Sequence, residues 1–406
     1  MNDHHAGKLY WPLTMTHVKS YPALTGKQQV EVAIIGGGMS GICCGLVLAR
    51  SGISACVLER DAVAGASTSA NTGLLQFSND VMLTELIEQI GRTDAVRFYR
   101  ECLHAVEQLA LTAATLPGEI GFRRRSSLYY ASTEQDLPQL RKEYEALREH
   151  GFPVHYWEAE DIASRFPFSK PGAIVTAGDA EVNPFQFVQA MADAASEAGL
   201  LIRERTEIAL HRSIGGKQVL ETADGARIEA KHVIYAVGYE PEELRGQLIK
   251  AAINRSFAGV TRMQQSLAPW HESMMLWETA RPYLYLRTTI DGRIVIGGLD
   301  EERPDPVQGE AARQKRIAKL SRQLAELFPM LDSELEYEWS AAFGESRDNL
   351  PFIGRDPERD GVYYCLGYGG NGTVYSMMAA HLLRDLIRGE SHPMESIVGL
   401  SRPSLQ

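Results

Sequence analysis

Residues 31–60 read EVAIIGGGMSGICCGLVLARSGISACVLER, and this stretch decides the fold. The uninterrupted apolar run at 32–35 is typical of a strand that is buried on both faces. Gly36, Gly38 and Gly41 follow in the G-x-G-x-x-G spacing, and an Ala- and Leu-rich stretch typical of a helix comes next. These glycines allow a tight turn, a close approach of a pyrophosphate to the backbone, and close packing of helix on strand. The stretch therefore predicts a Rossmann-like dinucleotide-binding unit.

A second apolar run, at 53–58, ends in Glu59. A carboxylate at this point can accept hydrogen bonds from both ribose hydroxyls of an adenosine, while the free N–H groups at the helix N-terminus favour the phosphates. A glycine triplet alone is weak evidence, because glycine-rich turns are common. Here the glycine triplet lies between a strand and a helix, and a second strand that ends in an acidic residue follows at the expected distance. This combination strongly predicts a dinucleotide-binding unit.

The chain has 406 residues, more than one core usually fills, so we expect two lobes. Its net charge of −11 argues against a nucleic-acid or anionic-membrane partner, because both require a basic surface. The five cysteines lack C-x-x-C spacing, so we predict neither a disulfide framework nor a metal site. We find no signal peptide and no apolar run long enough for a membrane span, and we therefore expect a cytoplasmic protein.

The segment 65–73, GASTSANTG, consists of small or hydroxylic residues apart from Asn71. One interpretation is a flexible loop. The other is a backbone that runs close beside a flat ligand and offers hydroxyls to a pyrophosphate or ribityl chain.

The remaining chain alternates between helical and strand patterns. Helical spacing covers 81–114, 134–149 and 308–328, and Asn183-Pro184 predicts the start of another helix that ends at Gly199. Strand patterns occupy 122–132, a series from 200 to 238 that ends at Gly238, and 257–297. A second glycine-rich joint, at 367–373, links a strand to an apolar helix, whose N-terminus would stabilise negative charge on a ligand ring.

With these pieces in order, the chain resembles the D-amino-acid oxidase/glycine oxidase superfamily of FAD-dependent oxidoreductases from about residue 30 to 390. The likeness is carried by IIGGGMSGICCG, LER, GASTSANTGLL, VNP, HVIYAVGYE and the pair DNLPFIG and GYGGNGT. The resemblance implies an α/β plus β fold: a Rossmann-like FAD-binding lobe with a mixed sheet, and an α+β substrate lobe built on an antiparallel sheet. We expect an N-terminal arm at 1–29, the FAD lobe at 30–80, 155–240 and 340–390, the substrate lobe at 81–154 and 241–339, and a tail at 391–406.

The resemblance also assigns residues to the cofactor. Gly36, Gly38, Met39, Ser40 and Gly41 would lie at the pyrophosphate; Glu59, Arg60 and the backbone of Ile208 at the adenosine; Ser67 and Thr68 along the pyrophosphate and ribityl chain; Asn71, Thr72, Gly73, Leu74 and Gly238 beside the flavin; and Gly369, Gly370, Asn371, Gly372 and Thr373 at the pyrimidine edge of the ring. Covalently flavinylated relatives use a Cys just before that edge, and no Cys lies between Cys102 and Cys365, so we expect noncovalent FAD.

The sequence departs from the family at the substrate. Amino-acid oxidases of this superfamily grip the substrate carboxylate with arginines at positions that correspond here to Phe343 and Gly370. A bidentate clamp at either place is therefore missing. Arg287, Arg262 and Arg347 are candidate replacements, with surface ion pairs as the alternative role.

The implied reaction is oxidation of the C–N bond of an amine or amino-acid derivative. Hydride transfer from the carbon beside a neutral amine to flavin N5 would give an imine that hydrolyses, with no obligatory general base. Tyr283, Tyr285 and Arg287 share one face of a strand by its period of two, and we expect the tyrosines in the substrate pocket, with packing as their alternative role. The electron acceptor is O2 or another compound. Alternatives are C–O oxidation of a polyol phosphate and a flavin-bound sensor or assembly subunit without turnover; NAD is disfavoured, because it has no use for the joint at 367–373.

Overall fold

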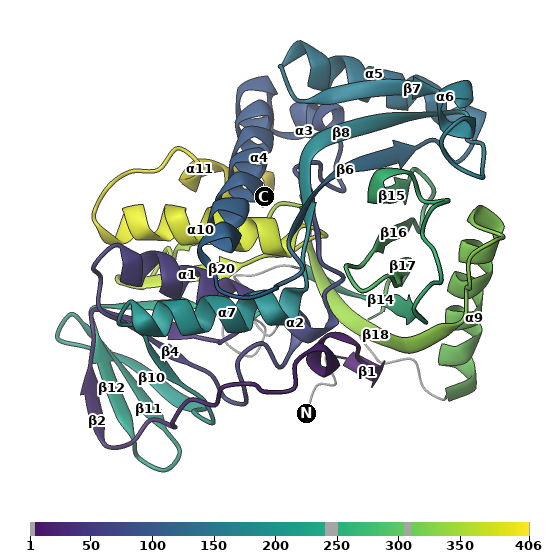
Figure 1. Ribbon diagram of the computed structural model, residues 1–406. Helices are drawn as coiled ribbons and strands as arrows, with labels where there is room; N and C mark the ends of the chain where they lie inside the picture. The colour runs from purple at the N-terminus through teal and green to yellow at the C-terminus, as the bar shows by residue number, and fades with distance from the viewer. Residues whose placement is uncertain (1–4, 240–250, 304–309, 406) are drawn as a thin grey trace.

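The computed structural model describes residues 5–239, 251–303 and 310–405, whose strands form three sheets (Figure 1). Parts of the expected arm (1–4), of the expected substrate lobe (241–250 and 304–309), and residue 406 lie outside the described residues.

A six-stranded sheet contains the dinucleotide unit, with the order β19-β20-β13-β3-β4-β9. All neighbouring pairs in it are parallel except β19 with β20. The carboxyl ends of β3 and β13 lie side by side, because His232 pairs with Val32 and Tyr235 with Ile35. The bounds are β3 Val32–Ile35, β4 Ala55–Leu58, β9 Leu201–Arg203, β13 His232–Tyr235, β19 Phe352–Arg355 and β20 Val362–Leu366.

The two faces of this sheet are covered differently. Val32 and Ile34 pack with helices α1 (Met39–Arg50), α7 (Pro184–Glu197) and α10 (Gly372–Ile387). Ala33, on the opposite face, packs with a second sheet of order β10-β11-β12-β2. Burial on both faces is why the run at 32–35 is apolar without alternation. The bounds of this second sheet are β10 Ile208–Ile214, β11 Lys217–Thr222, β12 Arg227–Ala230 and β2 Lys27–Gln29.

A ten-stranded mixed sheet builds the rest of the molecule, with the order β1-β18-β14-β17-β16-β15-β6-β8-β5 and β7 paired with β8. Helix α9 (Glu310–Leu327) covers one side of it through Ile317, Leu320 and Leu324. Helix α4 (Arg92–Thr115) packs against both α10 and β8 and so connects the two regions. The bounds are β1 His5–Lys8, β5 Leu74–Leu75, β6 Arg123–Tyr130, β7 Val154–Glu158, β8 Gly172–Glu181, β14 Ala251–Thr261, β15 Met275–Glu278, β16 Leu284–Thr288, β17 Ile294–Glu301 and β18 Leu335–Ser346.

The predicted helices are found close to their expected bounds. The stretch 81–114 forms α3 (Leu83–Ile90) and α4, with Gly91 between them, and 134–149 forms a short 3-10 turn followed by α5 (Leu137–Glu149). Asn183 caps α7 by accepting a hydrogen bond from the backbone of Gln186. The remaining short helices are α2 Ser67–Ala70, α6 Ala159–Ala163 and α11 Glu395–Val398, with 3-10 turns at Trp11–Thr14, Glu134–Asp136, His271–Ser273 and Pro403–Leu405.

Three features differ from the sequence-based expectation. Strands β7 and β8 fall in the segment 155–240 that we expected in the FAD lobe, but they pair with each other and β8 pairs with β6 in the large sheet. The arm at 1–29 contributes strands to two sheets, through β1 on β18 and β2 on β12. The segment 65–73 contains one helical turn, α2, because Ser69 and Asn71 donate backbone hydrogen bonds to carbonyls three residues earlier.

The tail at 391–406 is fixed to the six-stranded sheet region. The guanidinium of Arg402 donates to both carboxylate oxygens of Asp348, at 2.7 Å each, and to the carbonyls of Leu350 and Pro351. Both side chains of this ion pair are buried, so the tail belongs to the packed structure.

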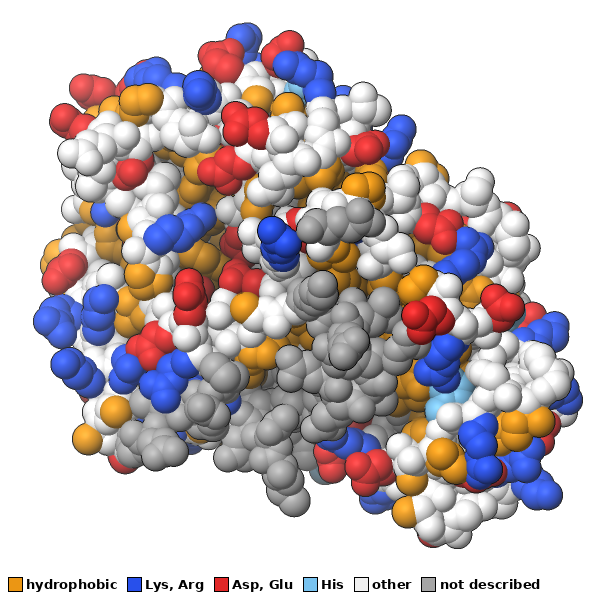
Figure 2. Space-filling view, turned by 180° about the vertical axis from the view of Figure 1, so that it is seen from behind, with side chains coloured by type: hydrophobic (Ala, Val, Ile, Leu, Met, Phe, Trp, Pro, Cys, Tyr) orange, Lys and Arg blue, Asp and Glu red, His pale blue; other side chains and the backbone are white. Residues whose placement is uncertain are grey.

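Acidic and basic side chains are interspersed over the face seen in Figure 2. The helices within the described ranges include none with both the length and the apolar character that crossing a membrane requires.

Candidate active site

The turn between β3 and α1 leaves the helix N-terminus open. Gly36 has a φ of +108°, and a Cβ on Gly41 would lie 1.9 Å from the carbonyl oxygen of Gly36, so only glycine fits at either place. Gly38, the N-cap, has no side chain to close the end, and the first turn carries no acidic residue. The Met39 amide donates to Thr68 Oγ1 at 3.0 Å, which brings α2 to this end of α1. Such a cradle fits a phosphate group.

The carboxylate of Glu59 folds back onto the same turn. It accepts hydrogen bonds from the amide of Gly37 at 2.6 Å and from the amide of Asp61 at 2.9 Å. Burial raises the pKa of Glu59, while these two amides act in the opposite direction. The neighbouring Arg60 is paired with Asp61 at 3.4 Å. Ile208 begins β10 close by, since Thr206 donates its amide to the Glu59 carbonyl.

A second helix N-terminus, that of α10, lies beside the first. Ser40 Oγ of α1 and Ser376 Oγ of α10 are 2.8 Å apart. The joint 369–373 is tied to the segment after β5: Asn371 Nδ2 donates to the carbonyl of Ser78 at 2.7 Å, and the amide of Gly370 donates to Asp80 Oδ2 at 3.0 Å. Gly238, with a φ of +63°, follows the adjacent β13.

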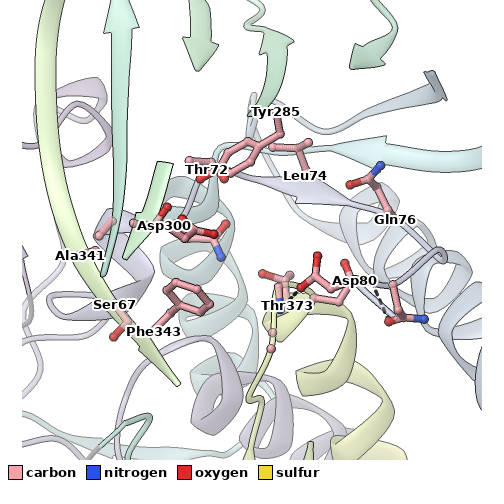
Figure 3. A pocket seen from close by; sticks show the side chains of 18 of the residues that line it. Ser67, Thr72, Leu74, Gln76, Asp80, Tyr285, Asp300, Ala341, Phe343 and Thr373 are labelled. Atoms are coloured by element: carbon pink, nitrogen blue, oxygen red, sulfur yellow. Dashed lines mark hydrogen bonds between the residues drawn. The ribbon is translucent and has the colours of Figure 1, made fainter. Parts of the chain in front are cut away.

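A cavity of about 160 Å³ lies between this joint and the large sheet (Figure 3). Many of the residues predicted for the cofactor line it: Ser67, Asn71, Thr72, Leu74, Gly369, Gly370, Asn371, Gly372 and Thr373. Other predicted cofactor residues, namely Gly36, Gly38, Met39, Ser40, Gly41, Glu59, Arg60, Thr68, Gly73, Ile208 and Gly238, are absent from its lining. Most of these lie around the β3–α1 turn, the end of β4 and the start of β10, whereas Gly73 contacts Asn71 and Val182 beside the large sheet. Thr68 connects the two groups, because its neighbour Ser67 lines the cavity while its own hydroxyl contacts α1.

Tyr283 and Tyr285, which we predicted for the substrate pocket, line the cavity from the large sheet. The ring of Tyr285 lies over Gly297, its partner across the strand pair, where a Cβ would come within 2.3 Å of the tyrosine oxygen. Burial raises the pKa of Tyr285 to about 12, and hydrogen bonds to Ser256 and Thr72 act against that rise.

The arginines proposed as carboxylate clamps lie elsewhere. Arg287 shares the face of Tyr285, but its buried guanidinium donates to the carbonyls of Thr72, Val182 and Thr288 and lies 3.7 Å from Glu181. Arg262 is paired with Glu334 on the surface. Neither Arg287, Arg262 nor Arg347 is among the cavity-lining residues that the structure describes.

Sequence reasoning missed the carboxylates of this cavity, Asp80 and Asp300. Asp80 lies seven residues after the end of the small-residue segment 65–73, and Asp300 lies at the end of the apolar run IVIGGLD. A lone acid near each of these two predicted elements was therefore the available signal. Burial raises the pKa of Asp80. Burial, with further contributions from Asp80 and Glu345, raises the pKa of Asp300 to about 7, against a hydrogen bond from Ser256.

No group of His, Cys, Asp and Glu side chains within the described ranges is arranged to hold a metal ion. The lining of the cavity combines the backbone of the joint 369–373, aromatic rings and carboxylates.

Comparisons with known proteins agree with this geometry. The chain is 25% identical to the probable oxidoreductase OrdL of Rhizobium meliloti over 98% of this chain and 92% of that protein. It is 25% identical to the glycine oxidase of Geobacillus kaustophilus, with 88% and 92% covered, and 22% identical to the gamma-glutamylputrescine oxidoreductase of Escherichia coli, with 96% and 91% covered. The crystal structure of that glycine oxidase superposes with a TM-score of 0.77 at 22% identity, covering 92% of this chain and 99% of the other.

The family model described as FAD dependent oxidoreductase (DAO) matches residues 31–386, which include both glycine joints and all the lining residues of the cavity. The chain therefore belongs to the DAO family of FAD-dependent oxidoreductases, and its cofactor is FAD.

Proposed function

We propose that the protein oxidises the C–N bond of an amine or amino-acid derivative. The observation that carries the proposal is the cavity of about 160 Å³, which Tyr283 and Tyr285 line together with residues 369–373 at the start of α10. Two relatives, a glycine oxidase and a gamma-glutamylputrescine oxidoreductase, are named for substrates of the same class.

The FAD would lie along the two glycine joints. The backbone amides at the start of α1 would hold the pyrophosphate, Glu59 the adenosine ribose, and residues 369–373 the pyrimidine edge of the flavin. Of the three sheets, the six-stranded and four-stranded ones would form the FAD lobe, and the ten-stranded sheet would cover the substrate. All five cysteines are buried and none lines the cavity, which favours noncovalent FAD.

Bound FAD would supply the hydride acceptor for oxidation of the carbon beside the amine nitrogen. The protein's own contribution is positional: Tyr283, Tyr285 and Phe343 would hold that carbon against the ring and keep water away. The carbon loses a hydride while the nitrogen lone pair forms the C=N bond, which gives an iminium ion, so the amine must be neutral. Water then hydrolyses the iminium ion to a carbonyl compound and an amine or ammonia, and the released proton goes to that nitrogen or to solvent.

Product analysis tests this proposal. The holoenzyme is incubated with an electron-accepting dye and a panel of amines, N-methyl amino acids and D-amino acids, and the carbonyl and amine products are quantified. We expect equal amounts of both products from at least one compound. A panel of polyol phosphates is the second arm, because turnover there and none with amines would assign C–O oxidation instead. Absence of turnover with both panels would contradict an enzymatic role for the flavin.

A further inference from the structure

The charge of the cavity lining has one sign. Among the described residues that line it, Asp80 and Asp300 carry the charges, and the set includes no Lys, Arg or His. Figure 3 shows both carboxylates pointing into the cavity below the ring of Tyr285. They come from distant parts of the chain: Asp80 from the segment after β5, and Asp300 from β17.

Each carboxylate is fixed by donors that leave it room for another partner. Asp80 accepts hydrogen bonds from the Gly370 amide at 3.0 Å and from the Tyr283 hydroxyl. Asp300 accepts one from Ser256, while its Oδ1 atom has no hydrogen-bond partner within the described structure. A carboxylate has sites for about four hydrogen bonds, so both retain acceptor capacity.

The two carboxylates disfavour each other's charge. Asp80 raises the pKa of Asp300, and it also raises the pKa of Glu345, which lies just beyond on β18. Like charges withdrawn from water destabilise one another unless a cation lies between them.

One cation, Arg281, lies beside Asp80 and Tyr283 without lining the cavity. Arg281 is exposed, donates to the backbone carbonyl of Asp80 at 3.3 Å, and lies 5.0 Å from the centre of the Tyr283 ring. It lowers the pKa values of Asp80 and Asp300 from there without lining the cavity. The inner space therefore lacks a positive partner of its own.

The walls of the cavity also suit a cation. Tyr283, Tyr285 and Trp277 present aromatic rings, whose faces attract ammonium groups. Trp277 is 6% exposed, and its ring stacks on that of Tyr129.

We propose that this cavity selects an amine substrate that carries a second, nonreacting cationic nitrogen, as a diamine or polyamine does, and that Asp80 and Asp300 bind that nitrogen. The inference rests on the proposed amine oxidation and names its substrate class. The same two carboxylates repel a substrate carboxylate, so plain amino acids are disfavoured.

A four-carbon series tests the proposal, because its members differ only at the far end. The FAD-loaded protein is titrated anaerobically with 1,4-diaminobutane, butylamine and 4-aminobutanoate, and the dissociation constant of each is taken from the change in flavin absorbance. A charge-assisted contact of this kind is worth about tenfold to a hundredfold in affinity. We therefore expect 1,4-diaminobutane to bind at least about tenfold more tightly than butylamine, and 4-aminobutanoate to bind most weakly.

Variants then assign the effect to the two acids. D80N and D300N should each reduce the preference for 1,4-diaminobutane over butylamine, with unchanged FAD content. E88Q is the control, because it removes the same charge from the exposed face of α3.

Equal affinities across the series, tighter binding of 4-aminobutanoate, or no binding of 1,4-diaminobutane would overturn the inference. A different result would contradict the proposed function. If dithionite reduces the flavin but no amine in any panel does, the protein does not oxidise amines. The ranking of the dissociation constants would still show whether the cavity prefers a ligand with a second positive charge.

Discussion

Asp80 occupies the space that a side chain at residue 370 would fill: its Oδ2 atom lies 3.0 Å from the Gly370 amide nitrogen and 2.3 Å from the position of a Cβ on that residue. The contact joins the segment after β5 to the start of α10, at the edge of the cavity. It also places a carboxylate where the family resemblance led us to look for an arginine.

The first prediction concerns this contact. G370A should push the Asp80 carboxylate away from the α10 N-terminus, because a Cβ at 2.3 Å from an oxygen cannot be accommodated. The expected result is roughly tenfold weaker binding of 1,4-diaminobutane with little change in thermal stability, since the backbone at this residue is not in the left-handed region. Titration and a melting curve measure both. Unchanged affinity would mean that the carboxylate position is irrelevant to binding.

The second prediction concerns pH. The pKa of Asp300 is raised to about 7, so its protonated form predominates below that pH and its charged form above. Affinity for 1,4-diaminobutane, corrected for protonation of the free ligand, should therefore increase between pH 6 and 8 and become flat in D300N. A profile that is the same in wild type and D300N would assign the titration to another group.

The same shift predicts an effect on stability. Because the pKa of Asp300 is raised from 3.8 to about 7 on folding, its contribution to stability is fully present below about pH 4 and is lost progressively as pH rises to about 7. D300N should therefore raise the melting temperature of the apoprotein most at pH 8, less at pH 5.5 and little near pH 4. The difference between the two melting temperatures, measured with E88Q as the control, checks the sign.

The third prediction concerns Glu59. Replacing its carboxylate in E59Q keeps the shape but weakens the acceptor for two amides and, in our proposal, for the adenosine ribose. FAD affinity should fall about tenfold, corresponding to ~1.4 kcal/mol. E31Q is the matched control, because Glu31 precedes the opposite end of β3 and pairs with Lys231 at 3.3 Å. Equal FAD dissociation constants for E59Q, E31Q and wild type would remove Glu59 from the cofactor site.

The fourth prediction separates structure from recognition at Arg287. R287L removes three hydrogen bonds to backbone carbonyls and should destabilise the fold by about 2–4 kcal/mol. Because Arg287 does not line the cavity, the ranking of the four-carbon ligands should be preserved in the folded holoprotein. A specific loss of 4-aminobutanoate binding would instead indicate a carboxylate clamp.

The local parts of this structure were predictable from the sequence. The apolar run at 32–35 predicted β3, because a strand that is buried on both faces has few polar residues. The glycine spacing predicted the start of α1, because close packing of a helix on a strand requires small residues at fixed positions. Asn183 likewise predicted the start of α7 through its capping hydrogen bond. The period of two in a strand was sufficient to predict that the side chains of Tyr283 and Tyr285 lie on the same face.

The remaining features depend on contacts between distant residues. The same periodicity predicted that Arg287 lies on the face of the two tyrosines. Its guanidinium, however, donates a hydrogen bond to the carbonyl of Val182, which follows β8 and is distant in the sequence. The pairing of β8 with β6 places residues 172–181 in the large sheet, although we expected this part of the chain in the FAD lobe. Asp80 and Asp300 meet only because the fold brings β17 to the segment after β5, and no local pattern encodes that meeting.

The most direct test of the central claim is the absorbance spectrum of the purified protein during anaerobic addition of an amine. Our account predicts the spectrum of bound FAD and the loss of its long-wavelength band on mixing with at least one amine, 1,4-diaminobutane among the first to try. A protein that is colourless and takes up no added FAD, or a flavin that dithionite reduces and every amine leaves oxidised, would contradict the account.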